Sequence, residues 1–118
     1  MNVNKHLVRA TREGRIGGTT ASGYVIPANS VLPFVALPSR RALGRILRVT
    51  NPLNGTNCLC MVMDVGPHNT ADDAYVFGGA RPLAESQAGS NGAGIDFGER
   101  VWTLLQMKDN TSVEWHFL

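Results

Sequence analysis

Short apolar runs separated by turn-forming residues dominate the pattern of this chain, which predicts a protein built mainly from short strands. Residues 44–50 and 57–63 are two such runs, and Asn54-Gly55 between them supplies the positive φ of a tight turn, so they predict a β-hairpin. Apolar and polar residues alternate over 112–118, which predicts a final strand. The 13 glycines and 6 prolines also favour a β-rich fold over a helical bundle.

The remaining segments are less regular. Residues 31–37 are apolar but contain Pro33, which predicts an edge strand or an irregular stretch because proline cannot donate a ladder hydrogen bond. Residues 97–107 have helical spacing of apolar positions, which predicts a helix. The 68–94 segment predicts a long loop, with a short helical turn near 70–76, and a loop of this length is usually functional or mobile.

Composition and charge set limits on the class of protein. With 118 residues, 43% of them apolar and 17% charged, the chain is long enough for one globular domain with its own core. The net charge of +2 is too small to argue for a nucleic-acid partner. Basic residues gather in the first half, as a solvated face or as a site for an anionic polymer: Lys5, Arg9, Arg12, Arg15, Arg40, Arg41, Arg45 and Arg48. We therefore predict a basic N-terminal segment, 1–16, followed by a single domain over 17–118.

Cysteine use and targeting signals narrow the picture further. Cys58 and Cys60 lie two positions apart on a predicted strand, too far for an easy disulfide, and are interpreted as small buried or half-buried hydrophobes. The spacing of ligand-type residues does not match a zinc site, so we expect no metal and no cofactor. Residues 1–15 lack the apolar core of a signal peptide, and no apolar run reaches membrane length. We expect cytoplasmic synthesis without membrane insertion, with virion or other non-classical delivery if the target lies outside.

Two acids stand beside apolar segments. Asp64 ends the run 58–63 and precedes Val65-Gly66-Pro67, and Asp96 follows Gly94-Ile95. Paired carboxylates are the groups that glycan-cleaving enzymes use. Each acid has a structural alternative: an aspartate before Gly-Pro is a common turn former, and Asp96 with Glu99 fits a helix capping box.

The order of several motifs resembles one family, the rare-lipoprotein-A-like double-psi β-barrels. The resemblance runs from about residue 17 to residue 107 and rests on this ordered series: Thr20-Ala21-Ser22-Gly23, Gly44, Leu47-Arg48-Val49-Thr50-Asn51, Asn54-Gly55, Asp64-Val65-Gly66-Pro67 and Ile95-Asp96-Phe97. It implies a mainly β fold, a six-stranded double-psi β-barrel with one or two short helices, a long loop and a shallow groove. Relatives include expansins, some endoglucanases and barrel-type lytic transglycosylases, which act on or bind cell-wall polysaccharide.

The resemblance also implies roles for particular residues. The family's catalytic acid falls on Asp64, and the aspartate of its Ile-Asp-Leu-Ser segment falls on Asp96. Tyr24 stands where the family often has a glutamate, and the histidine that the family often has before the first hairpin strand has no match in Ala36-Leu37-Pro38-Ser39. His68, Asn69, Asp72, Asp73 and Tyr75 in the long loop are further candidates for substrate binding, with Tyr75 as the exposed aromatic that would stack on a sugar.

The implied activity is directed at peptidoglycan or a related polysaccharide. As a lytic transglycosylase, Asp64 would have a raised pKa, protonate the glycosidic oxygen and then serve as the base that closes an anhydro ring. If Asp64 and Asp96 act together, the enzyme is an inverting hydrolase instead. The alternative function is non-catalytic: a glycan-binding domain, or a structural subunit with protein partners in a larger assembly such as a bacteriophage particle.

Overall fold

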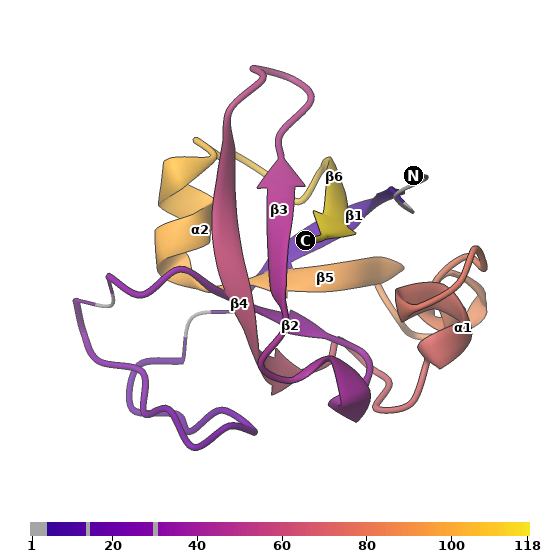
Figure 1. Ribbon diagram of the computed structural model, residues 1–118, viewed down its shortest axis with the longest axis horizontal. Helices are drawn as coiled ribbons and strands as arrows, with labels where there is room; N and C mark the ends of the chain where they lie inside the picture. Colours follow the sequence, from indigo (N-terminus) through magenta and orange to yellow (C-terminus); the bar gives the residue numbers. More distant parts are fainter. Residues whose placement is uncertain (1–4, 14, 30) are drawn as a thin grey trace.

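Six strands close into a barrel in the computed structural model, which describes residues 5–13, 15–29 and 31–118 (Figure 1). The strands are β1 (His6–Arg12), β2 (Phe34–Leu37), β3 (Ile46–Thr50), β4 (Asn57–Val65), β5 (Ala93–Phe97) and β6 (Ser112–Phe117). Two short α-helices, α1 (Asp73–Val76) and α2 (Glu99–Leu104), and two 3-10 turns, η1 (Arg40–Ala42) and η2 (Leu83–Ser86), lie in the connections. The predicted mainly β, six-stranded barrel with short helices is confirmed.

The order of strands around the barrel is β1-β5-β2-β4-β3-β6. The β1·β5 and β2·β4 pairs are parallel, and the other pairs are antiparallel, which is the mixed arrangement of a double-psi barrel. β2 lies between β4 and β5, and all four of its residues are buried. The prediction of an edge strand or irregular stretch here was wrong, because Pro33 stands just before β2 and a closed barrel leaves no edge.

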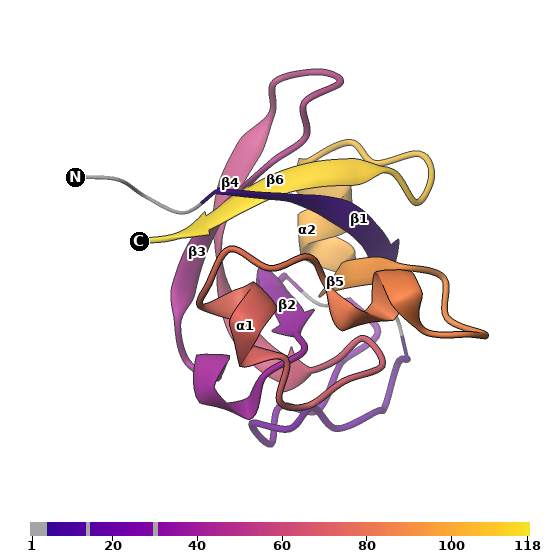
Figure 2. The same cartoon turned by 90° about the vertical axis from the view of Figure 1, so that its right-hand side faces the viewer.

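The barrel begins before the predicted domain boundary at residue 17. β1 pairs with β5 and with β6, so it lies inside the 1–16 segment that the sequence set apart (Figure 2). The strand alternates, since Val8 and Ala10 face the core while Leu7 and Arg9 are exposed, but basic residues at the exposed positions masked this pattern. The basic residues therefore occupy the outer face of a barrel strand, and the domain starts with that strand.

The predicted hairpin is confirmed, since β3 and β4 are antiparallel and joined through residues 51–56. Residues 112–117 form the predicted last strand, and α1 falls within the predicted helical turn. Cys58 is half-buried and Cys60 is buried, and both are free thiols, as predicted. None of the helices in the described ranges is long and apolar enough to span a membrane.

The helix predicted over 97–107 is shorter than its pattern, and its predicted cap was wrong. α2 begins at Glu99 with Gly98 at the cap position, and Asp96 is the fourth residue of β5. Asp96 pairs in register with residues on both neighbouring strands, which holds it in extended backbone and keeps it out of a capping box. The Glu99 carboxylate instead accepts a hydrogen bond from Arg12 Nε at 2.7 Å.

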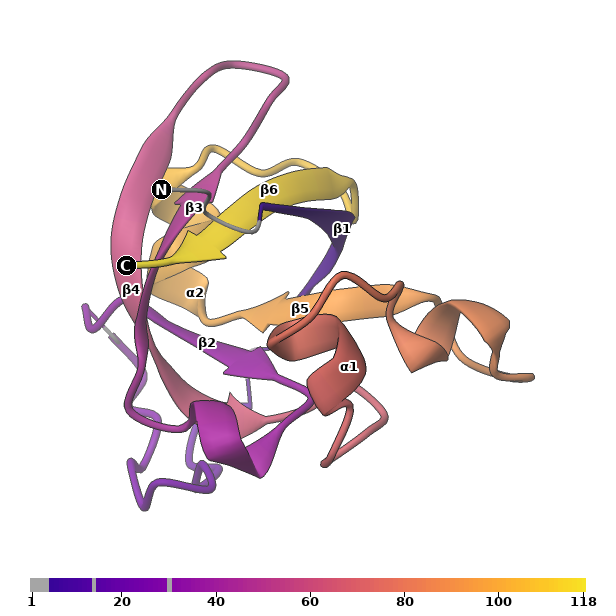
Figure 3. The same cartoon turned by 45° about the vertical axis from the view of Figure 1, so that its right-hand side comes forward.

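Side chains from the six strands and from α1 fill the barrel interior. Tyr75 of α1 is fully buried; its hydroxyl donates to the Gly94 carbonyl at 2.9 Å and accepts from Trp115 Nε1 at 2.9 Å. Leu47, Val49 and other core residues surround this pair. The helix in the long loop is thus tied to the core through Tyr75 and Val76, and it lies beside the barrel in Figure 3.

Candidate functional site

One line of residues crosses four adjacent strands of the barrel. Thr11 of β1 pairs with Asp96 of β5, Asp96 pairs with Ala36 of β2, and Ala36 pairs with Asp64 of β4. Neighbouring strands lie about 4.8 Å apart, so the backbones of the two aspartates are about 10 Å apart with only the alanine between them. The fold therefore brings together the two acids that the sequence selected.

A register shift directs Asp64 toward this line. Val35 pairs with Val62, but the next residue of β2, Ala36, pairs with Asp64, so Met63 is an extra residue in β4. Val35 and Val62 both face the core. Because a bulge of one residue reverses the alternation of a strand, Asp64 shares the outer side of the barrel with Ala36. Bulges of this kind re-aim side chains, and here the result is an accessible carboxylate.

Backbone amides fix the Asp64 carboxylate. Asp64 Oδ1 accepts from the amides of Ala21 and Val65, both at 2.9 Å. The first amide belongs to the connection between β1 and β2, which passes over the end of β4. Gly66, with φ of 141°, allows the turn after Asp64, and a Cβ placed on it would lie 3.9 Å from Asp96 Oδ2. The two aspartates therefore border the same turn.

Glu13 completes the site and was missed at the sequence level. It directly follows β1, and its amide donates to the Phe97 carbonyl at 2.7 Å. Glu13 and Asp64 line the same cavity, and the buried Oε2 of Glu13 receives no hydrogen bond from the described residues. This combination fits a carboxylic acid that donates its own proton to Asp64. Recognising the alternation of Val8 and Ala10 as a strand would have placed Glu13 at a strand end, but its proximity to Asp64 depends on barrel closure.

The three acids have different electrostatic environments. Burial, the hydrogen bond with Asp64 and the nearby negative charges of Asp64 and Asp96 raise the pKa of Glu13 to about 9. Burial alone would raise the pKa of Asp64, but the hydrogen bonds from Glu13, Ala21 and Val65 outweigh it and lower this pKa. The raised Asp64 pKa expected from the sequence is thus corrected, because the proton of the pair resides on Glu13.

Asp96 has a raised pKa, chiefly from burial and also from the charge of Asp64. A hydrogen bond donated by the Thr11 hydroxyl and the nearby His68 act in the opposite direction. His68 itself is exposed, and its Nε2 lies 3.1 Å from Asn91 Oδ1. The loop therefore contributes His68 to the surroundings of Asp96.

Two adjoining cavities open beside the carboxyl pair. One, of about 210 Å³, is lined by Glu13, Asp64, Ile26 and their neighbours. The other, of about 600 Å³, shares Glu13 and Ile26 and continues past Ile16 and Pro27. Together they form a groove with an apolar wall, which we call the Glu13 groove, and its lining includes both acids of the pair.

The other predicted substrate-binding residues divide into two groups. Tyr24 is half-buried and packs edge-on against Phe34, with ring centroids 5.7 Å apart, in the connection that covers Asp64. Asn69 exchanges two hydrogen bonds with the Gln87 amide. The binding roles predicted for these two residues and for His68 stay predictions.

Asp72, Asp73 and Tyr75 serve the fold of the loop. Asp72 is only 3% exposed, and its Oδ2 accepts from the Leu83 amide at 2.8 Å. Asp73 accepts from the Ser39 hydroxyl and from Arg41 Nη1. The expectation that Tyr75 is an exposed stacking residue was wrong, because the ring is part of the core and has no surface to offer a sugar.

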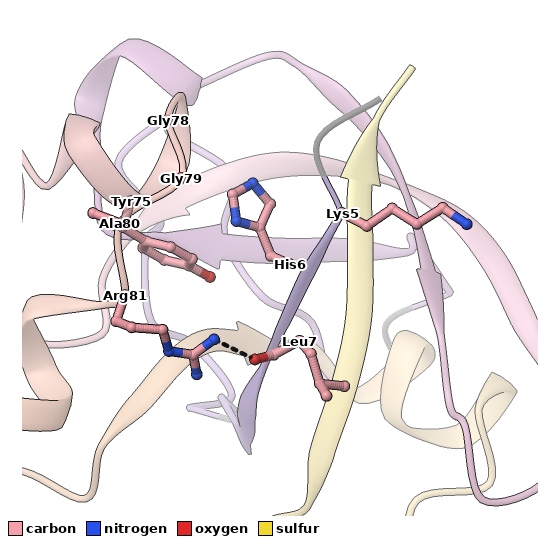
Figure 4. A pocket seen from close by; sticks show the side chains of 8 residues that line it. All are labelled: Lys5, His6, Leu7, Tyr75, Gly78, Gly79, Ala80 and Arg81. Carbon is pink, nitrogen blue, oxygen red and sulfur yellow. Dashed lines mark hydrogen bonds between the residues drawn. The ribbon is translucent and has the colours of Figure 1, made fainter. Parts of the chain in front are cut away.

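A separate cavity of about 210 Å³ lies at the start of β1, away from the carboxyl pair (Figure 4). The His6 ring stacks on Trp115 and meets Tyr75 edge-on, and burial followed by the charge of Arg81 lowers its pKa. Arg81 donates to the Leu7 carbonyl and to Glu85. The guanidinium of Arg81 is therefore already paired with the Glu85 carboxylate. Across the described ranges, no group of three or more His, Cys, Asp or Glu side chains is arranged to hold a metal ion.

One family model matches more than half of this chain. The model of DUF8814, described as a domain of unknown function, matches residues 4–85 and includes β1 to β4. The chain belongs to this family. The match crosses residue 17, as expected if β1 is part of the domain. No curated protein matches the chain.

Two solved structures share the fold. The Streptomyces papain inhibitor superimposes with a TM-score of 0.59 at 17% identity, over 98% of this chain and 94% of that one. A point mutant of the Clavibacter michiganensis expansin, in complex with cellohexaose, gives 0.55 at 16% identity, over 98% of this chain and 50% of that one. The chain thus spans about half of the expansin. These similarities show the fold, and membership of the rare-lipoprotein-A-like family itself stays a prediction.

Proposed function

We propose that this protein binds and cleaves a cell-wall polysaccharide, such as peptidoglycan, in the Glu13 groove. The observation that carries the proposal is the pair of acids, Glu13 and Asp64, that line one cavity, with Oε2 of Glu13 buried and without a hydrogen bond from the described residues. A carboxyl group with a pKa of about 9 still holds its proton at neutral pH. It can therefore give this proton to the glycosidic oxygen as that oxygen leaves. The expansin of the same fold, whose structure contains cellohexaose, supports a glycan as the ligand.

The pair favours an intramolecular cleavage. Two-carboxylate hydrolases separate their acids by about 5 Å or more and give them separate roles, whereas the carboxyl groups of Glu13 and Asp64 interact directly and shift each other's pKa. The pair therefore acts as one unit that holds and exchanges a proton. A lytic transglycosylase needs only such a unit, because the sugar supplies its own nucleophile.

The reaction then balances within the pair. Glu13 gives its proton to the glycosidic oxygen as the bond from that oxygen to the anomeric carbon breaks. A hydroxyl of the same sugar attacks the anomeric carbon and closes an anhydro ring, and its proton passes to the Asp64 carboxylate. Transfer of that proton from Asp64 to Glu13 restores the starting state. If Asp96 instead activates a water across Ala36, the product is that of an inverting hydrolase.

A second candidate is binding without cleavage, as a glycan-binding domain or as a subunit of a larger assembly such as a phage particle, which would deliver the barrel to a cell wall. The observation that favours a protein partner is the apolar surface of the connection between β1 and β2. Ile16, Val25 and Val31 are all exposed there. An exposed apolar group beside a groove is typical of a contact surface.

The test is incubation of the purified protein with peptidoglycan sacculi, followed by mass spectrometry of the soluble products. Asp64→Asn and Glu13→Gln are the test variants, and Asp109→Asn, which changes an exposed acid in the connection before β6, is the control. The proposed mechanism would be supported if the wild type and the control variant release anhydro-muropeptides and both test variants do not. Reducing-end products would indicate hydrolysis and bring Asp96 forward. Binding of sacculi without products would support the second candidate.

A further inference from the structure

Two stacked phenylalanines close the end of the barrel where β3 begins. Phe77 follows α1 and Phe117 ends β6, and their ring centroids are 5.5 Å apart with an angle of 20° between the planes. Both rings pack against the core from its edge, together with Leu43. No pattern along the chain predicts this pairing, because the residues come from separate elements.

Two arginines lie over these rings. Arg45 Cζ is 4.3 Å from the centroid of Phe117 and 5.6 Å from that of Phe77, and Arg41 Cζ is 5.1 Å from that of Phe77. These distances are within the range of cation–π contacts. Stacking uses the flat face of a guanidinium and leaves its N–H edge available for a carboxylate. We call Arg41, Arg45, Phe77 and Phe117 the arginine cap.

The charge of the cap is only partly compensated. Arg41 is paired with Asp73 at 2.9 Å, which holds it in place over Phe77. Arg45 is exposed, and none of the ion pairs between described residues includes it. Arg40, beside Arg41 in η1, is exposed as well. The surface therefore presents ordered guanidinium groups in excess over acids.

The arginine cap and the acid pair share one end of the barrel. β3 and β4 are antiparallel, so the start of β3 lies beside the end of β4 (Figure 1). The Arg45 carbonyl accepts from the amide of Val62, two residues before Asp64. A polymer that contacts both regions would therefore have to extend from Asp64 past this strand pairing to Arg45.

We propose that the arginine cap binds carboxylate groups on the polysaccharide that occupies the Glu13 groove, so that the preferred ligand is an acidic glycan. This inference rests on the proposed function and adds the chemical class of the polymer. The planar fork of a guanidinium matches a carboxylate with two parallel hydrogen bonds. A nucleic acid fits less well, because the aromatic faces on which bases would stack are already covered by the arginines.

The test measures co-sedimentation with sacculi whose carboxylates are intact or have been converted to amides with carbodiimide and ammonia. The variants are Arg45→Gln and Arg41→Gln, with Arg100→Gln on α2 as a control that removes the same charge elsewhere. We expect amidation to weaken wild-type binding at least about five-fold, since charge-assisted hydrogen bonds are lost. Arg45→Gln should bind intact sacculi as weakly as the wild type binds amidated ones, and amidation should affect this variant little. Arg100→Gln should behave as the wild type does.

Equal weakening by Arg45→Gln and Arg100→Gln would overturn the inference, because it would indicate diffuse charge attraction. Insensitivity of the wild type to amidation would also overturn it. Duplex DNA that competes with sacculi for the wild type but not for Arg45→Gln would show a general polyanion site and overturn the assignment to a glycan. Cleavage that depends on Asp64 and Glu13 but not on Arg45 would remove this inference and leave the proposed function intact.

Discussion

The acids of this protein form two sets that look alike in the sequence and differ in the structure. Asp72 and Asp73, in the long loop, accept hydrogen bonds from a backbone amide, a hydroxyl and an arginine. Glu13, Asp64 and Asp96 instead lie close to one another, and burial raises the pKa of two of them. The first set uses its charge to hold the loop. In the second set Glu13 keeps its proton, and the acids face an open groove.

The difference teaches that the partners of an acid decide its role. A carboxylate with several donors is fixed as an ion and stabilises the elements that supply those donors. Acids that surround one another share protons, because neighbouring negative charges disfavour full ionisation. Asp64 has both amide donors and an acid neighbour. Because the amides stabilise its negative charge, it is the ionised member of its pair.

The largest expected effect comes from removing the shared proton. In Glu13→Gln the amide still donates to Asp64 but supplies no proton, so product release from sacculi should fall at least about 100-fold while binding is kept. Asp73→Asn, in the other set, should leave the rate within about two-fold. Comparable rates for Glu13→Gln and wild type would place the pair outside the chemistry.

The next effect is on folding, through the buried member of the loop set. Asp72→Ala removes the acceptor of the Leu83 amide and should lower the free energy of unfolding by about 1–3 kcal/mol. Asp72→Asn keeps a carbonyl oxygen at that position and should lose less. Urea denaturation followed by tryptophan fluorescence measures both variants, and equal losses would argue against this hydrogen bond.

A smaller effect should appear in the pH dependence of stability. The pKa of Glu13 is about 9 in the folded chain against an ordinary 4.5, so the stability it contributes is present below the lower value and lost as the pH rises toward the higher one. Asp64, with a lowered pKa, contributes in the opposite sense, and its share is lost at acid pH. Glu13→Gln should remove a loss of about 1–2 kcal/mol between pH 5 and pH 9, after solvent screening.

Denaturation at a series of pH values checks this prediction. The variant should be more stable than the wild type near pH 9 and similar to it near pH 5. Parallel curves for the two proteins would mean that Glu13 titrates in its ordinary range and that the shared proton is absent.

The smallest effect concerns the exposed ion pair of the loop. Arg41 and Asp73 lie at the surface, where the interaction between such charges is weak and screened by salt. Asp73→Asn should leave the urea midpoint close to that of the wild type, and the remaining difference should shrink as salt is added. A large, salt-independent loss would move Asp73 into the same class as Asp72.

Much of the local structure could be predicted from the sequence. The Asn54-Gly55 turn and the alternation of Val113, Trp115 and Phe117 are periodic or positional signals, which depend only on neighbours along the chain. The choice of Asp64 and Asp96 as candidate acids also followed from their positions beside apolar runs. β1 was missed because its exposed positions carry basic residues, which drew attention to charge and away from the period of two.

Tertiary structure alone decided the rest. The bulge at Met63 turns Asp64 outward, and the register across β5, β2 and β4 places Asp96 near it. No local pattern encodes a partner 51 or 32 residues away, which is how far Glu13 and Asp96 are from Asp64 in the chain. The sequence determined the elements and the supply of acids; barrel closure determined which acids meet, and burial beside one another determined which of them holds the proton.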